Sequence, residues 1–132
     1  LGWKVRLKNM DWKSLVHSIY HEPDMVYRFG WSSPMQDPAV FLAGFVTKDP
    51  FNFSGYSNPK FDRLVDEIVA MRPSAEREAK IIEAQRIVLE TDAAVVPLYH
   101  YVTTYAVGPR IKTYDVSPLS GVTLFEEVEL KD

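Results

Sequence analysis

Apolar residues follow a helical spacing in some parts of the chain and an alternating spacing in others. Helices are predicted for residues 12–20, 38–45, 59–72 and 74–90. Residue types that cap helix N-termini precede the helical segments. These capping residues are Asp11, Asp37 and Asn58, and Ser74 starts the last of the four helices. The segment 59–72 has the clearest apolar face, because its apolar residues recur three and four positions apart. They are Phe61, Leu64, Val65, Ile68 and Val69.

Three other segments have the character of β-strands. Residues 3–8 alternate apolar with basic side chains, which is the period of a half-buried strand. Residues 25–29 form a short apolar and aromatic run, and residues 95–107 are rich in β-branched and aromatic types. Pro97 predicts an edge position or a bulge for the long segment. Shorter strands are expected at 122–124 and 128–130.

Strands that alternate with helices predict an α/β fold, in which helices flank a mixed sheet with at least one parallel pair of strands. Ligands in such sheets bind outside the carboxyl ends of the strands. The predicted strand at 25–29 ends at Arg28, Gly30 and Trp31. A binding site is therefore expected at this strand end.

Composition narrows the class of protein. The 132 residues, 46% hydrophobic and 25% charged, are typical of one globular domain. A net charge of −3 gives no electrostatic reason to expect nucleic acid as a partner. The absence of cysteine excludes disulfides, thiolate metal sites and a cysteine nucleophile. Because the chain begins Leu1-Gly2-Trp3, with neither an initiator Met nor a signal segment, we expect a piece of a longer protein.

Histidine offers little catalytic chemistry in this sequence. His17 and His21 stand four residues apart, a spacing that can bind a metal, but no third ligand is evident and a solvated surface pair is favoured. His100 has no acidic or hydroxyl partner in a recognisable motif. No nucleophile elbow, zinc helix or phosphate loop is present. The chain is therefore expected to be no enzyme, and a small hydrolase that uses His100 is the weaker alternative.

Two further groups of side chains have structural interpretations. The helix at 74–90 carries a mixed-charge face that predicts an exposed surface with pairs four residues apart. Its members are Glu76, Arg77, Glu78, Lys80 and Glu83. Three tyrosines, Tyr99, Tyr101 and Tyr105, project to one side of the predicted long strand. They either stack on a ligand or pack beneath a neighbouring helix.

Arg28 and Trp31 are the strongest candidates for ligand contact. A guanidinium at the end of a strand suits a carboxylate or another planar anion, because it donates two parallel hydrogen bonds. A tryptophan in the adjoining loop supplies a flat apolar wall with one donor. The residues alone leave core packing as an equal alternative.

Several segments together carry a resemblance to a known family. They are LGWKVRLKNMDWKSL (1–15), RFGWSSPMQDPAVFL (28–42), NFSGYSNPKFDRLVDE (52–67) and VVPLYHYVTTYAVGPRIKTY (95–114), with the helix at 74–90 between the last two. In this order they resemble the C-terminal part of the family 5 extracellular solute-binding proteins, the peptide- and nickel-binding components of ABC importers.

The resemblance implies a bilobal periplasmic-binding-protein-like (type II) fold, in which two α/β lobes close on the ligand. Residues 1–94 would be the C-terminal part of the second lobe, and residues 95–132 would return to the first lobe. The implied function is to capture a peptide or a peptide-like solute and deliver it to permease subunits in the membrane. The implied location is the periplasm, or the cell exterior with a membrane anchor, and no cofactor or metal is expected.

The resemblance also assigns site residues. Arg28 matches the arginine that holds the ligand carboxylate, and Trp31 matches a residue that lines the cleft, with Gly30, Ser32, Ser33 and Pro34 in the same loop. Peptide-binding members commonly carry an Asp at the position of Pro34, where it takes the ligand α-ammonium. The alternatives to a free peptide therefore include a blocked peptide, an oligosaccharide, a metal chelate and an opine-like compound.

The long segment at 95–107 predicts self-association. If the rest of both lobes is missing from this chain, the apolar faces of this segment lose their covering partners. We expect copies of the chain to associate through it.

Overall fold

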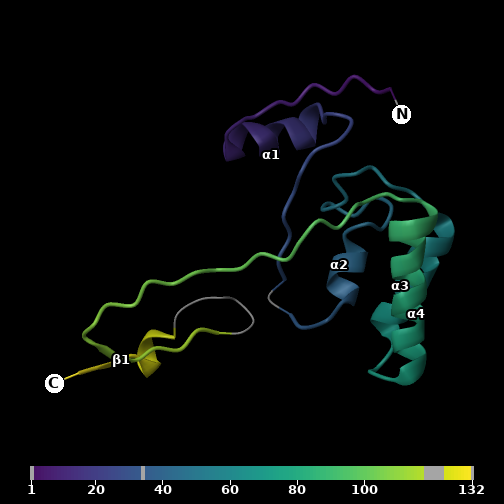
Figure 1. Ribbon diagram of the computed structural model, residues 1–132. Helices are drawn as coiled ribbons and strands as arrows, with labels where there is room; N and C mark the ends of the chain where they lie inside the picture. The colour runs from purple at the N-terminus through teal and green to yellow at the C-terminus, as the bar shows by residue number, and fades with distance from the viewer. Residues whose placement is uncertain (1, 34, 118–123, 132) are drawn as a thin grey trace. The chain divides into compact units, whose positions relative to one another are not determined.

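The computed structural model describes residues 2–33, 35–117 and 124–131. The chain divides into two compact units, residues 1–31 and residues 32–132. The first unit contains α1 (Trp12–His21). The second contains α2 (Ala39–Ala43), α3 (Pro59–Ala70), α4 (Ala75–Arg86), the π-helical turn η1 (Ile87–Thr91), β1 (Ile111–Thr113), the 3-10 turn η2 (Phe125–Glu127) and β2 (Glu129–Leu130) (Figure 1).

Helix α1 forms where the sequence predicts it. Asp11 caps its N-terminus, since the carboxylate accepts hydrogen bonds from the Ser14 backbone N–H at 3.1 Å and the Ser14 hydroxyl at 2.6 Å. Ile19 is buried within the unit. Trp12 stacks on Phe29 with ring centroids 5.6 Å apart, which holds the segment before Gly30 against the start of α1.

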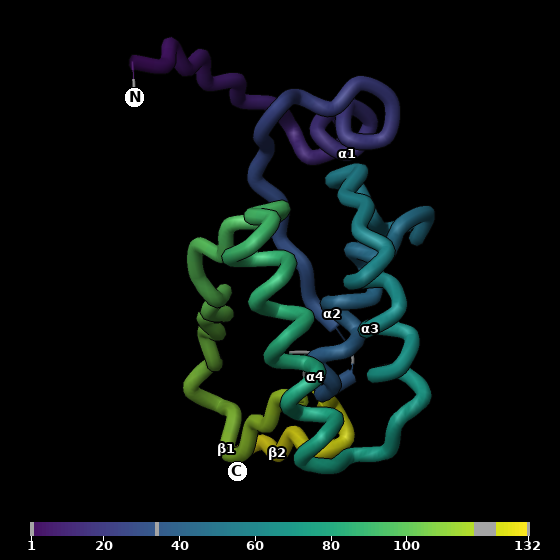
Figure 2. The backbone as a smooth tube through the Cα atoms, turned by 90° about the vertical axis from the view of Figure 1, so that its right-hand side faces the viewer, coloured from purple at the N-terminus to yellow at the C-terminus, as the bar shows by residue number. Residues whose placement is uncertain are grey.

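The core of the second unit lies between α2, α3 and α4, and Figures 1 and 2 both show α3 and α4 side by side. Asn58 caps α3 by accepting from the backbone N–H groups of Lys60 and Phe61. Four of the five predicted apolar residues of α3 are buried, but Val69 is 63% exposed. The prediction for Val69 is wrong, because near the C-terminal end of α3 this side of the helix no longer packs against the core and is exposed to solvent. The buried core consists of Ala39, Leu42, Phe61, Leu64, Val65, Ile68, Ile81, Ala84, Ile87 and Val88.

Arg77 contradicts the predicted mixed-charge surface of the long helix. Only 9% of this residue is exposed. Its Nε donates to the Ile68 carbonyl at 3.0 Å, in the last turn of α3, and its Nη2 donates to the Asp37 carboxylate at 2.8 Å, just before α2. One guanidinium therefore satisfies a carbonyl at a helix C-terminus and binds the start of another helix.

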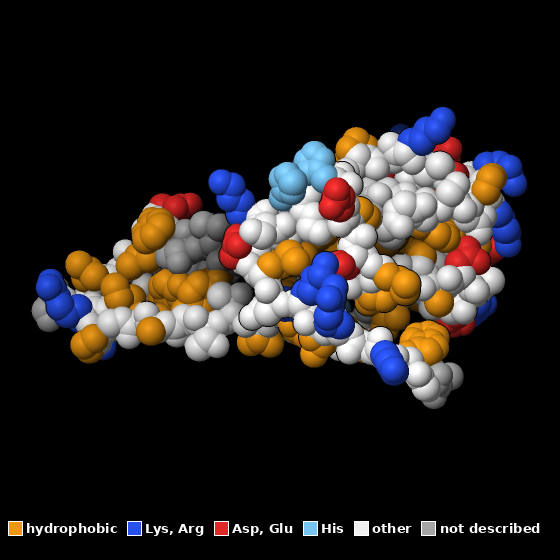
Figure 3. Space-filling view, turned by 90° about the horizontal axis from the view of Figure 1, so that it is seen from above, with side chains coloured by type: hydrophobic (Ala, Val, Ile, Leu, Met, Phe, Trp, Pro, Cys, Tyr) orange, Lys and Arg blue, Asp and Glu red, His pale blue; other side chains and the backbone are white. Residues whose placement is uncertain are grey.

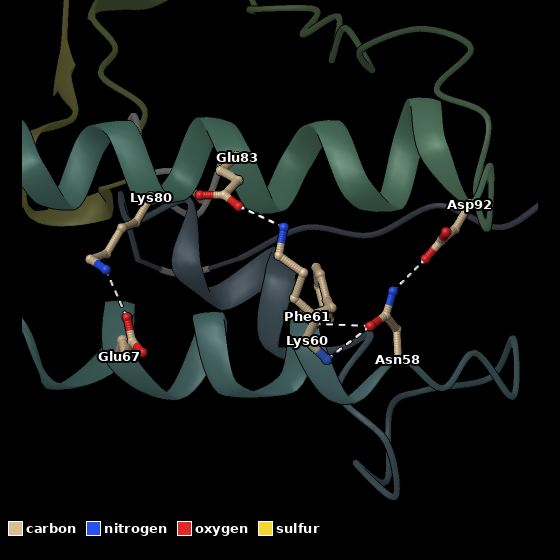
Figure 4. A network of polar contacts seen from close by, with 7 residues as sticks. All are labelled: Asn58, Lys60, Phe61, Glu67, Lys80, Glu83 and Asp92. Atoms are coloured by element: carbon tan, nitrogen blue, oxygen red, sulfur yellow. Dashed lines mark hydrogen bonds and ion pairs between the residues drawn. The ribbon is translucent and has the colours of Figure 1, made fainter.

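Two other charged residues of α4, Lys80 and Glu83, pair across helices. Lys80 lies 2.7 Å from Glu67 of α3, and Lys60 of α3 lies 3.0 Å from Glu83 (Figure 4). These pairs are exposed and contribute little individually. Their arrangement differs from the predicted pairing four residues apart, because α3 packs alongside α4 and brings closer partners.

The predicted α/β alternation is wrong for the described part of the chain. Residues 3–8, 25–29 and 95–107 have no strand pairing, and Figure 1 draws the last as coil. Since a strand exists only through hydrogen bonds to a neighbour, an apolar pattern without a partner remains extended coil. The described residues contain no parallel pair of strands.

A small antiparallel sheet follows the extended segment. β1 pairs with β2 through Ile111 and Leu130, and Lys112 forms an ion pair with Glu129 at 2.9 Å. The predicted strand at 128–130 is thus confirmed over two residues. The predicted strand at 122–124 lies largely outside the described residues.

Substitution of Arg77 tests its structural role. Arg77→Met keeps much of the apolar volume but removes both charge-assisted hydrogen bonds, so we expect a loss of about 1.5–3 kcal/mol in the free energy of unfolding. Urea denaturation measures this loss. Arg72→Met is the matched control, because Arg72 is exposed just beyond α3. Equal stability of the two variants would contradict the structural role of Arg77.

Candidate functional site

The candidate binding loop starts in the first unit and ends in the second. Arg28 is exposed, while Gly30 and Trp31 are half-buried at the end of the first unit. Ser32 is exposed and Ser33 is half-buried at the start of the second. Pro34 lies outside the described residues. The expected strand end is absent, because residues 25–29 form no strand.

Two acids close to the candidate loop in sequence form ion pairs. Asp24 pairs with Lys8 at 2.7 Å, and Asp37 pairs with Arg77 at 2.8 Å.

Hydrogen bonds fix the second half of the loop. The Ser33 hydroxyl accepts from the Met35 backbone N–H at 3.0 Å and donates to the Met35 carbonyl at 3.1 Å. Asp37 accepts from the Ala39 backbone N–H at 3.0 Å with one carboxylate oxygen and from Arg77 with the other. The loop thus ends at a carboxylate that is anchored in the helical core.

The environment of Asp37 favours its charged form. The hydrogen bond from the Ala39 backbone lowers the pKa of Asp37 most, and the bond from Arg77 lowers it further. Both carboxylate oxygens have partners within the protein. Asp37 therefore has a structural role, because it bonds to the start of α2 and to Arg77 of α4.

A hollow of about 350 Å³ lies beside Arg77 on the second unit. Its lining residues come from α4 and from the segments before α2 and α4. They are Pro38, Pro73, Ser74, Arg77, Glu78, Ile81, Ile82 and Gln85. None of the candidate loop residues lines this hollow.

A second polar cluster joins the start of α3 to the end of the long helix. Asp92 accepts from the Tyr56 hydroxyl at 2.6 Å and from the Asn58 side-chain amide at 2.7 Å, the latter visible in Figure 4. Asn58 thus caps α3 with its oxygen and holds Asp92 with its nitrogen. Ala93 follows with a φ of 47°, so the chain turns sharply at this cluster.

These contacts shift two pKa values in opposite directions. Burial, followed by the hydrogen bond to Asp92, raises the pKa of Tyr56 to about 12. The hydrogen bonds from Tyr56 and then Asn58 lower the pKa of Asp92. The cluster is therefore stable as a neutral phenol with a carboxylate.

The other candidates from the sequence are the tyrosines of residues 95–107 and a metal site. Tyr99 and Tyr101 contact each other edge to face, with ring centroids 5.3 Å apart, and both are exposed. In the part of the chain that the structure describes, no three His, Cys, Asp or Glu side chains gather as a metal site. The described helices are also too short or too polar to cross a bilayer.

Sequence reasoning missed the roles of Arg77, Tyr56 and Asp92. Asp37 and Arg77 are 40 residues apart, and Asn58 and Asp92 are 34 apart. No local pattern connects such positions. The sequence signal that points to this region is the density of turn and capping residues at 52–62. In the structure, Asn52 and Asn58 of this segment bond to several backbone groups.

Comparisons with known proteins identify the class. The chain is 30% identical over 114 residues to the periplasmic oligopeptide-binding protein OppA of Escherichia coli (strain K12), covering 86% of this chain and 21% of that protein. It is 26% identical over 117 residues to the periplasmic murein peptide-binding protein MppA of the same strain, covering 89% and 22%. It is also 30% identical over 93 residues to heme-binding protein A of Haemophilus influenzae (strain ATCC 51907 / DSM 11121 / KW20 / Rd), covering 68% and 17%.

These relatives are binding proteins, and most of the chain matches them. The chain belongs to the family 5 extracellular solute-binding proteins. It spans about a fifth of the length of the curated relatives it matches. No family model matches the chain.

The pH dependence of stability tests the Tyr56 cluster. Because the folded-state pKa of Tyr56 lies above its ordinary value of 10.0, its contribution to stability is complete below pH 10 and is lost as the pH rises towards about 12. Thermal melts of wild type and Tyr56→Phe between pH 9 and 12 should therefore converge at the alkaline end. Val69→Ala is the control, because this exposed side chain does not titrate, so its offset from wild type should stay constant. A constant offset for Tyr56→Phe would argue against the cluster.

Proposed function

We propose that this chain is the C-terminal part of the substrate-binding component of an ABC importer, which captures a peptide or peptide-like solute and delivers it to a membrane permease. The observation that carries this proposal is the match to an oligopeptide-binding protein over 86% of the chain. The relatives are named as periplasmic proteins, which supports a periplasmic location or an exported, membrane-anchored one.

The proposed architecture is bilobal. Residues 1–94 would complete the second lobe, and residues 95–132 would return to the first lobe. The unpaired state of residues 95–107 supports this division, because an extended apolar segment needs partner strands that the described residues do not provide. The polar cluster around Asp92 lies directly before that return and fixes where the segment leaves the helices.

The proposed ligand site is the loop from Arg28 to Pro34. Arg28 would hold the solute carboxylate, Trp31 would form an apolar wall, and Gly30, Ser32, Ser33 and Pro34 would complete the lining. The exposure of Arg28 fits a residue that meets a ligand. The anchor at Asp37 supports the proposal, because it holds one end of the loop to a packed core.

The pairing of Asp37 supports a choice of solute class. An α-ammonium is best held by a carboxylate whose charge is not already balanced, and the charge of Asp37 is balanced by Arg77. This pairing favours a peptide-like solute with a carboxylate and a blocked amine. A non-peptide solute such as a heme is the second candidate, since heme-binding protein A is also 30% identical to the chain, over 93 residues.

The test of the binding site is Arg28→Lys in the full-length protein. Lysine keeps the charge but loses the two-pronged hydrogen bond, so peptide affinity should fall about tenfold or more. The melting temperature should stay within about 1–2 °C, because an exposed side chain contributes little to the core. Calorimetric titration and thermal melts measure both quantities.

Arg63→Lys is the matched control for this experiment, because Arg63 is exposed on α3. Its affinity and melting temperature should match wild type. The 132-residue chain alone, without the opposite wall, should bind the same peptide weakly or not at all. A lowered melting temperature with unchanged affinity in Arg28→Lys would assign Arg28 a structural role.

Self-association of the isolated chain is a separate expectation. Residues 95–107 expose apolar side chains on both sides, with Val102 88% exposed and Leu98 69% exposed. We expect light scattering to show association that grows with protein concentration. Leu98→Lys with Val102→Lys should reduce it, because charged residues discourage edge pairing. A monomer at every concentration would contradict this expectation.

A further inference from the structure

Two histidine side chains lie together on the surface of α1. His17 and His21 are one helical turn apart, which places them on the same face. Their ring centroids are 4.4 Å apart and the ring planes are tilted by 44°. Both residues are exposed, and Figure 3 shows two histidine side chains in pale blue side by side.

The imidazole nitrogens are open to solvent. Within the described residues, neither His17 nor His21 has a hydrogen bond or an ion pair, and their ring contact is with each other. The core of the first unit uses Ile19, which lies between them in sequence and is buried. The pair is therefore not needed for packing.

The end of α1 also favours a positive charge. His21 lies in the last turn of the helix, where the carbonyl groups carry a partial negative charge. Glu22 follows as the C-terminal cap and is exposed. A cation bound between the imidazoles would meet a favourable field from the helix end.

We propose that His17 and His21 form a two-histidine chelate for a divalent transition metal ion, with Cu²⁺ bound most tightly and water in the remaining coordination positions. Neutral imidazole is a preferred ligand of Cu²⁺, Ni²⁺ and Zn²⁺, and Cu²⁺ leads this series. Metal–nitrogen bonds of about 2.0–2.1 Å require the two nitrogens to approach to about 3 Å. Rotation of two exposed side chains in neighbouring positions achieves this without moving the helix. The site is independent of the proposed solute-binding function.

The chain contains three histidines, so the test has an internal control. Calorimetric titration of the 132-residue chain with CuSO₄ should show one tight equivalent. His17→Ala and His21→Ala should each weaken Cu²⁺ affinity about tenfold or more. Loss of a residue that only hydrogen-bonds a metal ligand already lowers metal affinity about tenfold, and loss of a ligand itself should lower it at least as far. His100→Ala should leave the affinity unchanged within about twofold, because His100 lies on the extended segment. Alanine is the strongest helix former, so these variants retain α1.

Electron paramagnetic resonance separates this chelate from general copper binding. The wild-type Cu²⁺ spectrum should show coupling to two imidazole nitrogens, and each α1 variant should show one. Cu²⁺ should also raise the thermal stability of α1 helicity in wild type and not in these variants. Mg²⁺, which prefers oxygen ligands, should have no effect. Wild-type affinity in either α1 variant, loss of affinity in His100→Ala, or a single coupled nitrogen in wild type would each overturn the proposal.

Discussion

The guanidinium of Arg77 holds the helical unit together at a point where three helices meet. It donates to a carbonyl of Ile68 at the end of α3 and to the carboxylate of Asp37 before α2, while its own backbone belongs to α4. A buried guanidinium requires such partners, because an unpaired charge away from water is costly. The candidate loop depends on this contact, since Asp37 is its downstream anchor.

Tyr56, Asn58 and Asp92 form a second polar contact between helices. It joins the start of α3 to the end of the long helix, whereas Arg77 bonds to the end of α3. The Asn58 side chain has two roles. Its oxygen caps the N-terminus of α3, and its nitrogen donates to Asp92 at the end of the long helix. The left-handed Ala93 then turns the chain into the extended segment. The two polar contacts thus bond segments at both ends of the packed helices α3 and α4.

The chain's relatives in the solute-binding family are much longer than the chain itself. The matched relatives are about five times longer than the matched part of this chain. The described residues of the second unit form a helical core to which Asp37, just after the candidate loop, is bonded through Arg77. The segments at 3–8, 25–29 and 95–107 have the apolar composition of strands, but within the described residues they form no strand pairing.

The sequence by itself determined the features that depend on near neighbours. Asp11 and Asn58 cap helices as predicted, because a capping side chain bonds to backbone groups two or three residues away. The resemblance to the family was likewise readable from consecutive motifs. Only tertiary structure decided that Arg77 is buried, that Val69 is exposed and that Asp92 is held by Tyr56. Those outcomes depend on which distant segments meet, and local spacing carries no information about partners 30 or 40 residues away.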